Sequence, residues 1–394
     1  MRFLKLSVAI AAIWALMTAC SGSKGSSNKI PILAWYSIPA EYASEETYRD
    51  LADAGFTINF SHLTDLKDAM KALDLGQKTG VKIMFTCTQL GSDPEEIVKK
   101  VKDHPALFGY FLRDEPAAAD FPNLATWAKR IRSVDDTHPI YLNLFPNYAP
   151  DNILGCTYPE YVHRFVEEVG LPMLSFDYYP VTVEGVRESW WSNLEVVSKE
   201  AEAAGVPFWA FTLSTAHFPY PVATMNSMRL QLYTDLAYGA QGLQYFTYWC
   251  PTPGIWDFNN APVSETGQKT PVYGLVKEMN KEIQARAEVF LGAKVLSVKH
   301  TGETLPPGVS PLEELPSQVK TLDTKGKGAV VSLLENGDWQ YLMIVNRSLK
   351  EAVDYEIGFT VPVKQIGRNG KAASVKDGEY HLEEGDCAIF RWKK

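Results

Sequence analysis

Three acidic side chains in this sequence stand where they can carry out proton chemistry. Asp114 and Glu115 follow an apolar run at 107–112, and Asp177 ends a second run that begins at 173. Two carboxyl groups that face each other can act as an acid and as a base or nucleophile, provided that burial or a nearby negative charge keeps one of them protonated near neutral pH. We take Glu115 as the candidate acid/base, Asp177 as its candidate partner and Asp114 as the neighbour that raises the pKa of Glu115.

Polar and aromatic side chains recur at the ends of other apolar runs. An aromatic ring offers a flat apolar face on which a sugar ring can stack. With so few carboxylates among them, these residues favour a neutral, hydroxyl-rich ligand over a phosphate or a metal. The candidate ligand-binding residues are Asp114, Trp35, Asn143, Tyr179, His217, Tyr248, Trp249 and Trp256.

The roles expected for these candidate residues differ. Trp249 is the expected stacking platform, with core packing as the alternative. For Trp256, on the long loop that follows, stacking and lid packing are equally open. His217 is also compatible with a plain hydrogen-bonding role. Asp257 and Glu265 lie on the same loop, where charged side chains are usually solvated.

The runs themselves indicate the fold. Short β-rich runs alternate with amphipathic stretches, which predicts repeated βα units and a parallel sheet. Eight units between residues 31 and 291 match a closed (β/α)₈ barrel, in which functional groups lie at the C-terminal ends of the strands. An open doubly wound sheet is the alternative, and the absence of a Gly-rich phosphate loop disfavours it. The expected strands are 32–36, 56–60, 81–86, 107–112, 139–144, 173–177, 207–212 and 242–249.

The pattern of apolar and polar residues changes after about residue 291. A Pro-rich stretch at 305–317 is followed by alternating strands without helices, at 329–334, 339–346, 353–359, 361–366 and 387–392. Asn-Gly pairs at 336–337 and 369–370 are hairpin signals. Residues 292–394 are therefore predicted to form a small antiparallel β-sandwich.

The N-terminus has the form of an export signal. Basic residues precede a short apolar run, and the small residues before Cys20 resemble a bacterial lipobox, although Met17 stands where Leu is usual. This predicts a signal peptide at 1–19, lipidation of Cys20 and a flexible tether at 20–30. The expected product is an exported lipoprotein held to a bacterial membrane by its lipid alone, on the periplasmic side or the cell surface. A plain signal peptide is the alternative.

Charge and cysteine usage narrow the ligand classes. The net charge of -9 and the pI of about 5.4 argue against nucleic acid as a partner. The five cysteines form no C-x-x-C pair, so we expect no metal site, no other cofactor and no disulfide.

The run from Gly109 to Pro116 (GYFLRDEP) carries a family resemblance. It is similar to the fourth-strand motif of clan A glycoside hydrolases, in which Asn-Glu-Pro places the acid/base Glu, and Trp249 resembles the clan's aromatic platform. The barrel followed by a sandwich is similar in layout to family 42 β-galactosidases. Asp114 replaces the clan's Asn, which alters the expected contact to the sugar 2-hydroxyl.

The resemblance breaks at the second carboxylate. The clan's nucleophile is a Glu at the end of strand seven, but the segment 207–217 contains no acid. Asp177 is the best substitute, as nucleophile, as base of an inverting enzyme, or only as a group that binds hydroxyls or orients a loop.

The resemblance implies a glycoside hydrolase that acts on a poly- or oligosaccharide. Two alternatives stay open: a non-catalytic glycan-binding lipoprotein of hydrolase descent, and a barrel lyase or hydrolase acting on another polyol. A separation of about 5–10 Å between Glu115 and another carboxyl would favour hydrolysis.

Overall fold

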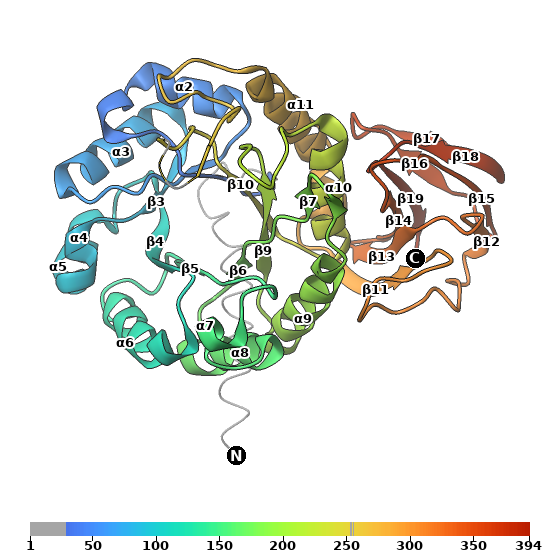
Figure 1. The fold of residues 1–394 in the computed structure, drawn as a ribbon, viewed down its shortest axis with the longest axis horizontal. Coiled ribbons are helices and arrows are strands. Elements are labelled where there is room, and N and C mark those ends of the chain that lie inside the picture. Colours follow the sequence, from blue (N-terminus) through green and yellow to red (C-terminus); the bar gives the residue numbers. More distant parts are fainter. Residues whose placement is uncertain (1–28, 253, 255) are drawn as a thin grey trace.

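The computed structural model describes residues 29–252, 254 and 256–394. Its first part confirms the predicted barrel: eight parallel strands, with helices around the outside, stand in the order β5-β4-β3-β2-β1-β10-β9-β6 (Figure 1). The ring closes where Leu144, just after β5, pairs in parallel with Phe176 of β6. The barrel strands are β1 (Ile32–Trp35), β2 (Ile58–Asn59), β3 (Lys82–Phe85), β4 (Leu107–Asp114), β5 (Ile140–Asn143), β6 (Leu174–Phe176), β9 (Phe208–Leu213) and β10 (Gly242–Phe246).

Local caps explain where the helices begin and end. The Ser44 hydroxyl accepts a hydrogen bond from the Thr47 amide at the start of α2 (3.2 Å), and Asp65 accepts from the Lys67 amide at the start of α3 (2.7 Å). Gly80 ends α3 at φ +79°, a left-handed conformation that glycine adopts without a steric cost. The helices are α2 (Glu45–Asp53), α3 (Leu66–Thr79), α4 (Thr88–Ser92), α5 (Pro94–Val101), α6 (Phe121–Arg132), α7 (Asp151–Leu154), α8 (Tyr158–Arg164), α9 (Ser189–Ala204), α10 (Met225–Ala237), α11 (Pro271–Ala285) and α12 (Ala287–Phe290).

Shorter elements occupy the connections. A small hairpin of β7 (Val181–Thr182) and β8 (Gly185–Val186) follows β6. Two 3₁₀ turns lie at Ala40–Tyr42 and Ala118–Asp120, and a π turn at Phe165–Val169 extends α8.

Aromatic side chains fill the interior of the barrel. The Trp35 ring lies 4.6 Å from Phe60, 5.6 Å from Phe111 and 5.2 Å from Phe211, measured between ring centroids. These residues belong to one buried cluster contributed by most of the barrel strands. A packed interior of this kind leaves the strand ends as the place for chemistry.

The second part is the predicted antiparallel β-sandwich. One sheet has the order β11-β13-β14-β19-β16-β17 and the other β12-β15-β18. Along β14, Leu342 and Ile344 face the sandwich core whereas Tyr341, Met343 and Val345 join the core shared with the barrel. Both faces of this strand are therefore buried, which explains its continuous apolar sequence. The strands are β11 (Lys294–His300), β12 (Val319–Asp323), β13 (Ala329–Asn336), β14 (Trp339–Asn346), β15 (Val353–Phe359), β16 (Lys364–Ile366), β17 (Ala372–Ser374), β18 (Gly378–Leu382) and β19 (Cys387–Lys393).

A buried ionic cluster joins the two parts beside α10 and α11. The Glu282 carboxylate lies 2.8 Å from Arg229 Nη2 and 3.6 Å from Arg286 Nη1, and it accepts a hydrogen bond from the Tyr233 hydroxyl at 2.7 Å. Arg286 also donates to the Gly367 carbonyl of the sandwich at 3.1 Å. Figure 1 shows the sandwich standing next to α10 at one side of the barrel.

The chain is anchored from its first described residues. Ile30 is buried, and its backbone exchanges two hydrogen bonds with the Gln284 side chain (2.8 and 3.0 Å), so residue 30 packs against the barrel. The predicted signal peptide at 1–19, Cys20 and the tether up to residue 28 lie outside the described residues. Within the described part, no helix combines the length and apolarity needed to cross a membrane, and the four cysteines there are free.

Candidate active site

Three carboxyl groups converge at the C-terminal ends of β4 and β6. Asp114 ends β4, Glu115 follows it, and Asp177 follows β6. Asn143, at the end of the intervening β5, sits between them: its amide nitrogen donates to Asp114 Oδ1 at 3.1 Å and to Asp177 Oδ1 at 3.2 Å. The structure therefore brings together the four polar residues that the sequence placed at these strand ends.

A buried network fixes the orientation of Asn143. Its amide oxygen accepts a hydrogen bond from the Ser175 hydroxyl at 2.9 Å, and Ser175 in turn accepts one from the Gln244 amide at 2.9 Å. Because this oxygen already has a donor, the NH₂ group must face the carboxylates. Asn143 thus acts as a rigid two-pronged donor that holds Asp114 and Asp177 in place.

The carboxyl groups of Glu115 and Asp177 lie close enough to affect each other's pKa. Two carboxylates in such proximity repel each other, which favours protonation of one of them. Burial, and then the charge of Asp114, raises the pKa of Glu115 to about 7. Burial, and then the charges of Glu115 and Asp114, raises the pKa of Asp177 well above its ordinary range. The pair therefore keeps a proton at neutral pH.

Asp114 is the third carboxyl of this acidic group, and it binds a proton less tightly than Glu115 does. Burial raises the pKa of Asp114 to about 6, and the hydrogen bond from Asn143 opposes that rise. Asp114 is exposed, and Glu115 and Asp177 are partly exposed. These side chains have pKa values raised by burial and still remain in contact with solvent, so a ligand at the barrel opening can reach them.

Three non-glycine residues at the opening have a left-handed backbone: Glu115 (φ +44°), Tyr36 directly after β1 (φ +47°) and Asn260 (φ +50°). Asn adopts this conformation more readily than the other two, so the strain lies at Glu115 and Tyr36. Non-glycine residues adopt this region rarely and at a cost, and such outliers concentrate at functional sites. The Glu115 amide is held by a 2.9 Å hydrogen bond to the Asn143 carbonyl, so the same residue fixes the backbone of Glu115 and the side chains of both aspartates.

Aromatic side chains line this end of the barrel. Trp35 is 3% exposed and belongs to the interior cluster, so it forms part of the floor and presents no open face. Tyr179 is also nearly buried, and its ring lies 5.4 Å from Phe246, which is partly exposed at the end of β10. Phe246 was missed from the sequence because the expected strand ran three residues too far.

Trp249 and Tyr248 do not reach the carboxyl group cluster. The Trp249 ring is 3% exposed and packs 4.9 Å from Tyr42, while its indole nitrogen donates to the Glu265 carbonyl at 3.3 Å. Tyr248 is buried against Phe56, with a centroid distance of 5.3 Å. Because β10 ends at Phe246, both side chains pack beneath the following loop, and the expected platform role of Trp249 does not fit its position.

His217 and Trp256 form a second aromatic group with Phe258 at the opening. The His217 ring lies 5.8 Å from Trp256 and 4.7 Å from Phe258, and burial lowers the pKa of His217, which keeps it neutral. Trp256 is 52% exposed, so its face is open to a ligand. Asp257, in contrast, accepts a hydrogen bond from the Phe218 amide at 2.9 Å and holds a loop.

The loops that follow the barrel strands carry most of the exposed apolar side chains. We call these loops, 36–44, 60–65, 86–93, 113–120, 144–157, 177–188, 214–224 and 247–270, the mouth loops. Of the eleven large hydrophobic residues exposed in the described chain, eight lie in mouth loops: Tyr36, Tyr42, Tyr148, Ile153, Val183, Phe218, Val222 and Trp256. Solvent-exposed aromatic rings concentrated around one opening indicate a binding surface.

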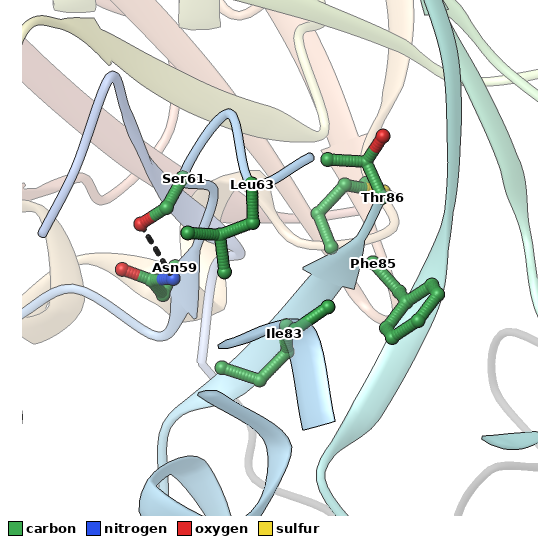
Figure 2. A pocket seen from close by; sticks show the side chains of 8 residues that line it. Asn59, Ser61, Leu63, Ile83, Phe85 and Thr86 are labelled. Atoms are coloured by element: carbon green, nitrogen blue, oxygen red, sulfur yellow. Dashed lines mark hydrogen bonds between the residues drawn. The ribbon is translucent and has the colours of Figure 1, made fainter. Parts of the chain in front are cut away.

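A small pocket between β2 and β3 lies apart from the carboxyl groups. Figure 2 shows Asn59 and Ser61 at its edge, joined by a 3.3 Å hydrogen bond. Ser61 also donates to the Ile38 carbonyl at 2.7 Å. The lining residues carry no titratable group, so this pocket is a packing crevice. Within the described residues, no group of three or more His, Cys, Asp or Glu side chains is arranged to hold a metal ion.

The fold and the site together define a (β/α)₈-barrel protein with a carboxyl site at its mouth and a C-terminal β-sandwich. No family model and no curated protein matches the sequence. Solved structures match the fold. A β-galactosidase from Bacillus circulans sp. alkalophilus aligns with a TM-score of 0.62 at 10% identity, over 92% of this chain and 99% of that one.

Two further solved structures align over most of this chain. A catalytic mutant of Gan42B, a GH42 β-galactosidase from G. stearothermophilus, aligns with a TM-score of 0.60 at 8% identity, over 94% of this chain and 99% of that one. An α-L-arabinofuranosidase from Thermotoga maritima aligns at 0.51 and 11% identity, over 91% and 92%. At these identities the likeness establishes the fold alone.

Proposed function

We propose that the protein is a glycoside hydrolase acting on a poly- or oligosaccharide, with Glu115 as general acid/base and Asp177 as the second carboxylate. The observation that carries this proposal is the convergence of Asp114, Glu115 and Asp177 around Asn143 at the barrel mouth, where burial raises the pKa of Glu115 to about 7. A glycosidic bond is cleaved by one carboxylic acid and one carboxylate. A pair that holds a single proton supplies both.

The proton held by the pair must be on Glu115 for the reaction. Burial, and then the charge of Asp114, raises the pKa of Glu115 to about 7, so this side chain can hold a proton near neutral pH. Glu115 then protonates the leaving oxygen. Asp177 is left ionised to attack the anomeric carbon or to activate a water.

The two carboxyls must stand roughly 5–5.5 Å apart in a retaining mechanism and 6.5–9.5 Å apart in an inverting one. Asp177 accepts a hydrogen bond from Asn143 at 3.2 Å, whereas no described side-chain donor holds the carboxyl group of Glu115. Of the two carboxyls, Glu115 is therefore the freer to adjust its position when a substrate enters.

Two further observations support a saccharide as the ligand. The exposed aromatic faces of Tyr36, Tyr148 and Trp256 surround the mouth, and such faces suit sugar rings. The solved structures that share this fold include enzymes named β-galactosidase and α-L-arabinofuranosidase. Because those names cover different sugars, they leave the sugar and its linkage open.

A second candidate is a glycan-binding protein without hydrolytic activity. It is favoured by the end of β9, where the following residues are Ser214 and Thr215 and no acid is present. Ser214 donates to the Thr247 carbonyl at 2.8 Å and Thr215 bonds the Thr247 hydroxyl at 2.7 Å. These hydroxyls are occupied in structural contacts and do not replace a nucleophile.

The experiment that separates the two candidates is a screen of the purified chain against nitrophenyl glycosides and plant and host glycans, with cleavage and binding measured in parallel. Cleavage supports the hydrolase. Binding without cleavage supports the second candidate. Failure of both with every saccharide overturns a carbohydrate function and favours another polyol substrate.

We also propose that the chain is exported and anchored through lipid on Cys20, because a basic start, a short apolar run and small residues precede this cysteine. Expression with a Cys20→Ala variant tests this. The native chain should partition into detergent-soluble membranes, and the variant should not. Equal partitioning of the two would contradict the anchor.

A further inference from the structure

Cationic side chains are scarce in the mouth loops. Lys and Arg occur there at three positions only: Arg113, Arg187 and Lys269. Arg113 lies 3.6 Å from Asp120, and Lys269 lies 2.6 Å from Asp50. Arg187 makes no ion pair within the described chain, which contains every acidic residue of the sequence. It is therefore the one cation of the mouth whose charge no carboxylate neutralises.

Arg187 is held in place by aromatic rings. Its guanidinium carbon lies 4.8 Å from the centroid of Tyr148 and 5.2 Å from that of Tyr220. Its Nη1 donates to the Tyr220 hydroxyl at 3.1 Å. Cation–π contacts orient a guanidinium and leave its positive charge in place. The Arg187 guanidinium is thus fixed in orientation and half-buried, and no carboxylate of the described chain forms an ion pair with it.

The same tyrosines connect Arg187 to the carboxyl site. Tyr220 lies 5.8 Å from Tyr179, and Tyr148 lies 5.1 Å from Tyr178, so the rings extend to the residues that follow Asp177. Burial, and then the charge of Asp177, raises the pKa of Tyr148. No Arg187 nitrogen lies within 4 Å of the Asp177 carboxylate, which argues against a role as its countercharge.

The guanidinium also has unused hydrogen-bonding capacity. Of its five N–H donors, only Nη1 makes a hydrogen bond to a described residue. None of its nitrogens is among the buried atoms that lack a partner, so solvent reaches the remaining donors. A planar fork of free donors on a fixed cation matches an oxyanion with two accessible oxygens.

We propose that Arg187 binds an acidic group on the substrate, a carboxylate or a sulfate ester carried by a sugar unit next to the reacting bond. This inference rests on the proposed function, because it takes the carboxyl site as the place where the saccharide is held. Arg187 sets specificity: it selects acidic saccharides over neutral ones and takes no part in breaking the bond.

The test measures binding, so that it does not depend on cleavage. The mature chain with Glu115→Gln would be titrated by calorimetry with methyl glucuronide, methyl galacturonide, galactose 6-sulfate, methyl glucoside and methyl galactoside. At least one acidic probe should bind about tenfold or more tightly than its neutral counterpart, as expected for a charge-assisted bidentate contact. The uronide and sulfate arms identify which acidic group is preferred.

Substitutions at Arg187 then locate the preference. Arg187→Gln should abolish the preference for acidic over neutral probes, while Arg187→Lys should retain part of it through the remaining charge. Arg49→Gln, on exposed α2 in an ion pair with Glu45, removes the same charge far from the mouth and should change nothing. If Arg187→Gln does not fold, the partial preference of Arg187→Lys still decides the question.

Three outcomes would overturn the inference: no acidic probe binds, neutral probes bind equally well, or the preference survives Arg187→Gln. These outcomes are distinct from failure of the proposed function. An acidic preference in a chain that cleaves nothing would retain the Arg187 assignment and remove the hydrolase. Cleavage of neutral glycans without a preference for acidic ones would retain the hydrolase and remove the Arg187 assignment.

Discussion

The carboxyl groups of Glu115 and Asp177 interact across the barrel mouth, and each affects the pKa of the other, although they follow different strands. β4 and β6 are not neighbours, since β5 lies between them and supplies Asn143. The pair is therefore a product of barrel closure. Its shared proton is the physical basis of the proposed acid catalysis, and each part of it can be tested separately.

Replacing Glu115 with Gln should reduce glycan cleavage by a factor of about 10²–10⁴ or more, because the amide cannot donate the proton that the leaving oxygen needs. The measurement is kcat/KM on whichever glycoside the screen identifies, with circular dichroism to check the fold. Glu96→Gln is a matched control, since Glu96 is an exposed helical residue paired only with Lys100. An unchanged rate in Glu115→Gln would remove the acid assignment.

The pH profile should report the coupled carboxyls. Cleavage needs one proton on the pair, so kcat/KM should fall as pH rises through about 7, where Glu115 loses its proton. Removing the Asn143 donors by Asn143→Ala should raise the pKa of Asp114 and Asp177, because these donors stabilise the ionised forms. The low-pH limb should then move upward. A profile with the same low-pH limb in Asn143→Ala would show that the residue does not tune the site.

The stability of the fold should respond to Glu115 with the opposite sign to activity. The pKa of Glu115 rises from 4.5 to about 7 on folding, so the folded chain binds the proton more tightly and loses stability as pH rises between these values. Glu115→Gln removes this loss. It should raise the free energy of unfolding by on the order of 1 kcal/mol at pH 8, after allowance for the partial exposure of the side chain, and by little at pH 4.

Thermal unfolding of both chains at pH 4 and pH 8 checks this. A variant that is less stable than the native chain at pH 8 would show that the Glu115 carboxylate is not destabilising. A variant that is more stable than the native chain but no longer cleaves glycans would fit a functional site. In such a site, side chains needed for the reaction lower the stability of the fold.

The position of the acidic site could be predicted from the sequence because two general rules act together. Alternating apolar runs predict parallel strands, and parallel strands in a barrel place their C-terminal ends on one face. Asp114, Asn143 and Asp177 each stand directly at such an end. The rule needs only the strand boundaries, and the predicted C-terminal ends of β4, β5 and β6 lie within two residues of the observed ends.

The aromatic part of the site was predicted less well, for a physical reason. The apolar sequence continues from Phe246 to Trp249 because the loop residues there are also buried, beneath Tyr42 and the backbone around Glu265. Hydrophobicity reports burial and does not distinguish a buried strand from a buried loop. Arg187 was not singled out for a different reason: its contacts with Tyr148 and Tyr220 join three separate loops.

Phe246 and Trp249 should therefore have contrasting roles. Trp249→Ala should lower the free energy of unfolding by about 3–5 kcal/mol, since it empties a packed volume. Phe246→Ala should weaken saccharide binding with a smaller effect on stability, because its ring is partly exposed at the mouth. Urea unfolding and calorimetry with the best-bound glycan measure the two effects. Weaker glycan binding by a folded Trp249→Ala chain, with Phe246→Ala unaffected, would restore Trp249 as the platform.

The link between barrel and sandwich should depend on one buried carboxylate. Glu282 is 6% exposed and neutralises Arg229 and Arg286, and Arg286 reaches the sandwich through the Gly367 carbonyl. Glu282→Gln would leave two buried cations without their shared partner, which costs about 3–5 kcal/mol in comparable cases. The midpoint of urea unfolding should fall accordingly. Glu351→Gln is the control, because its pair with Lys327 is exposed and such pairs contribute about 0–1 kcal/mol. Equal shifts in the two variants would mean that the buried cluster does not hold the two parts together.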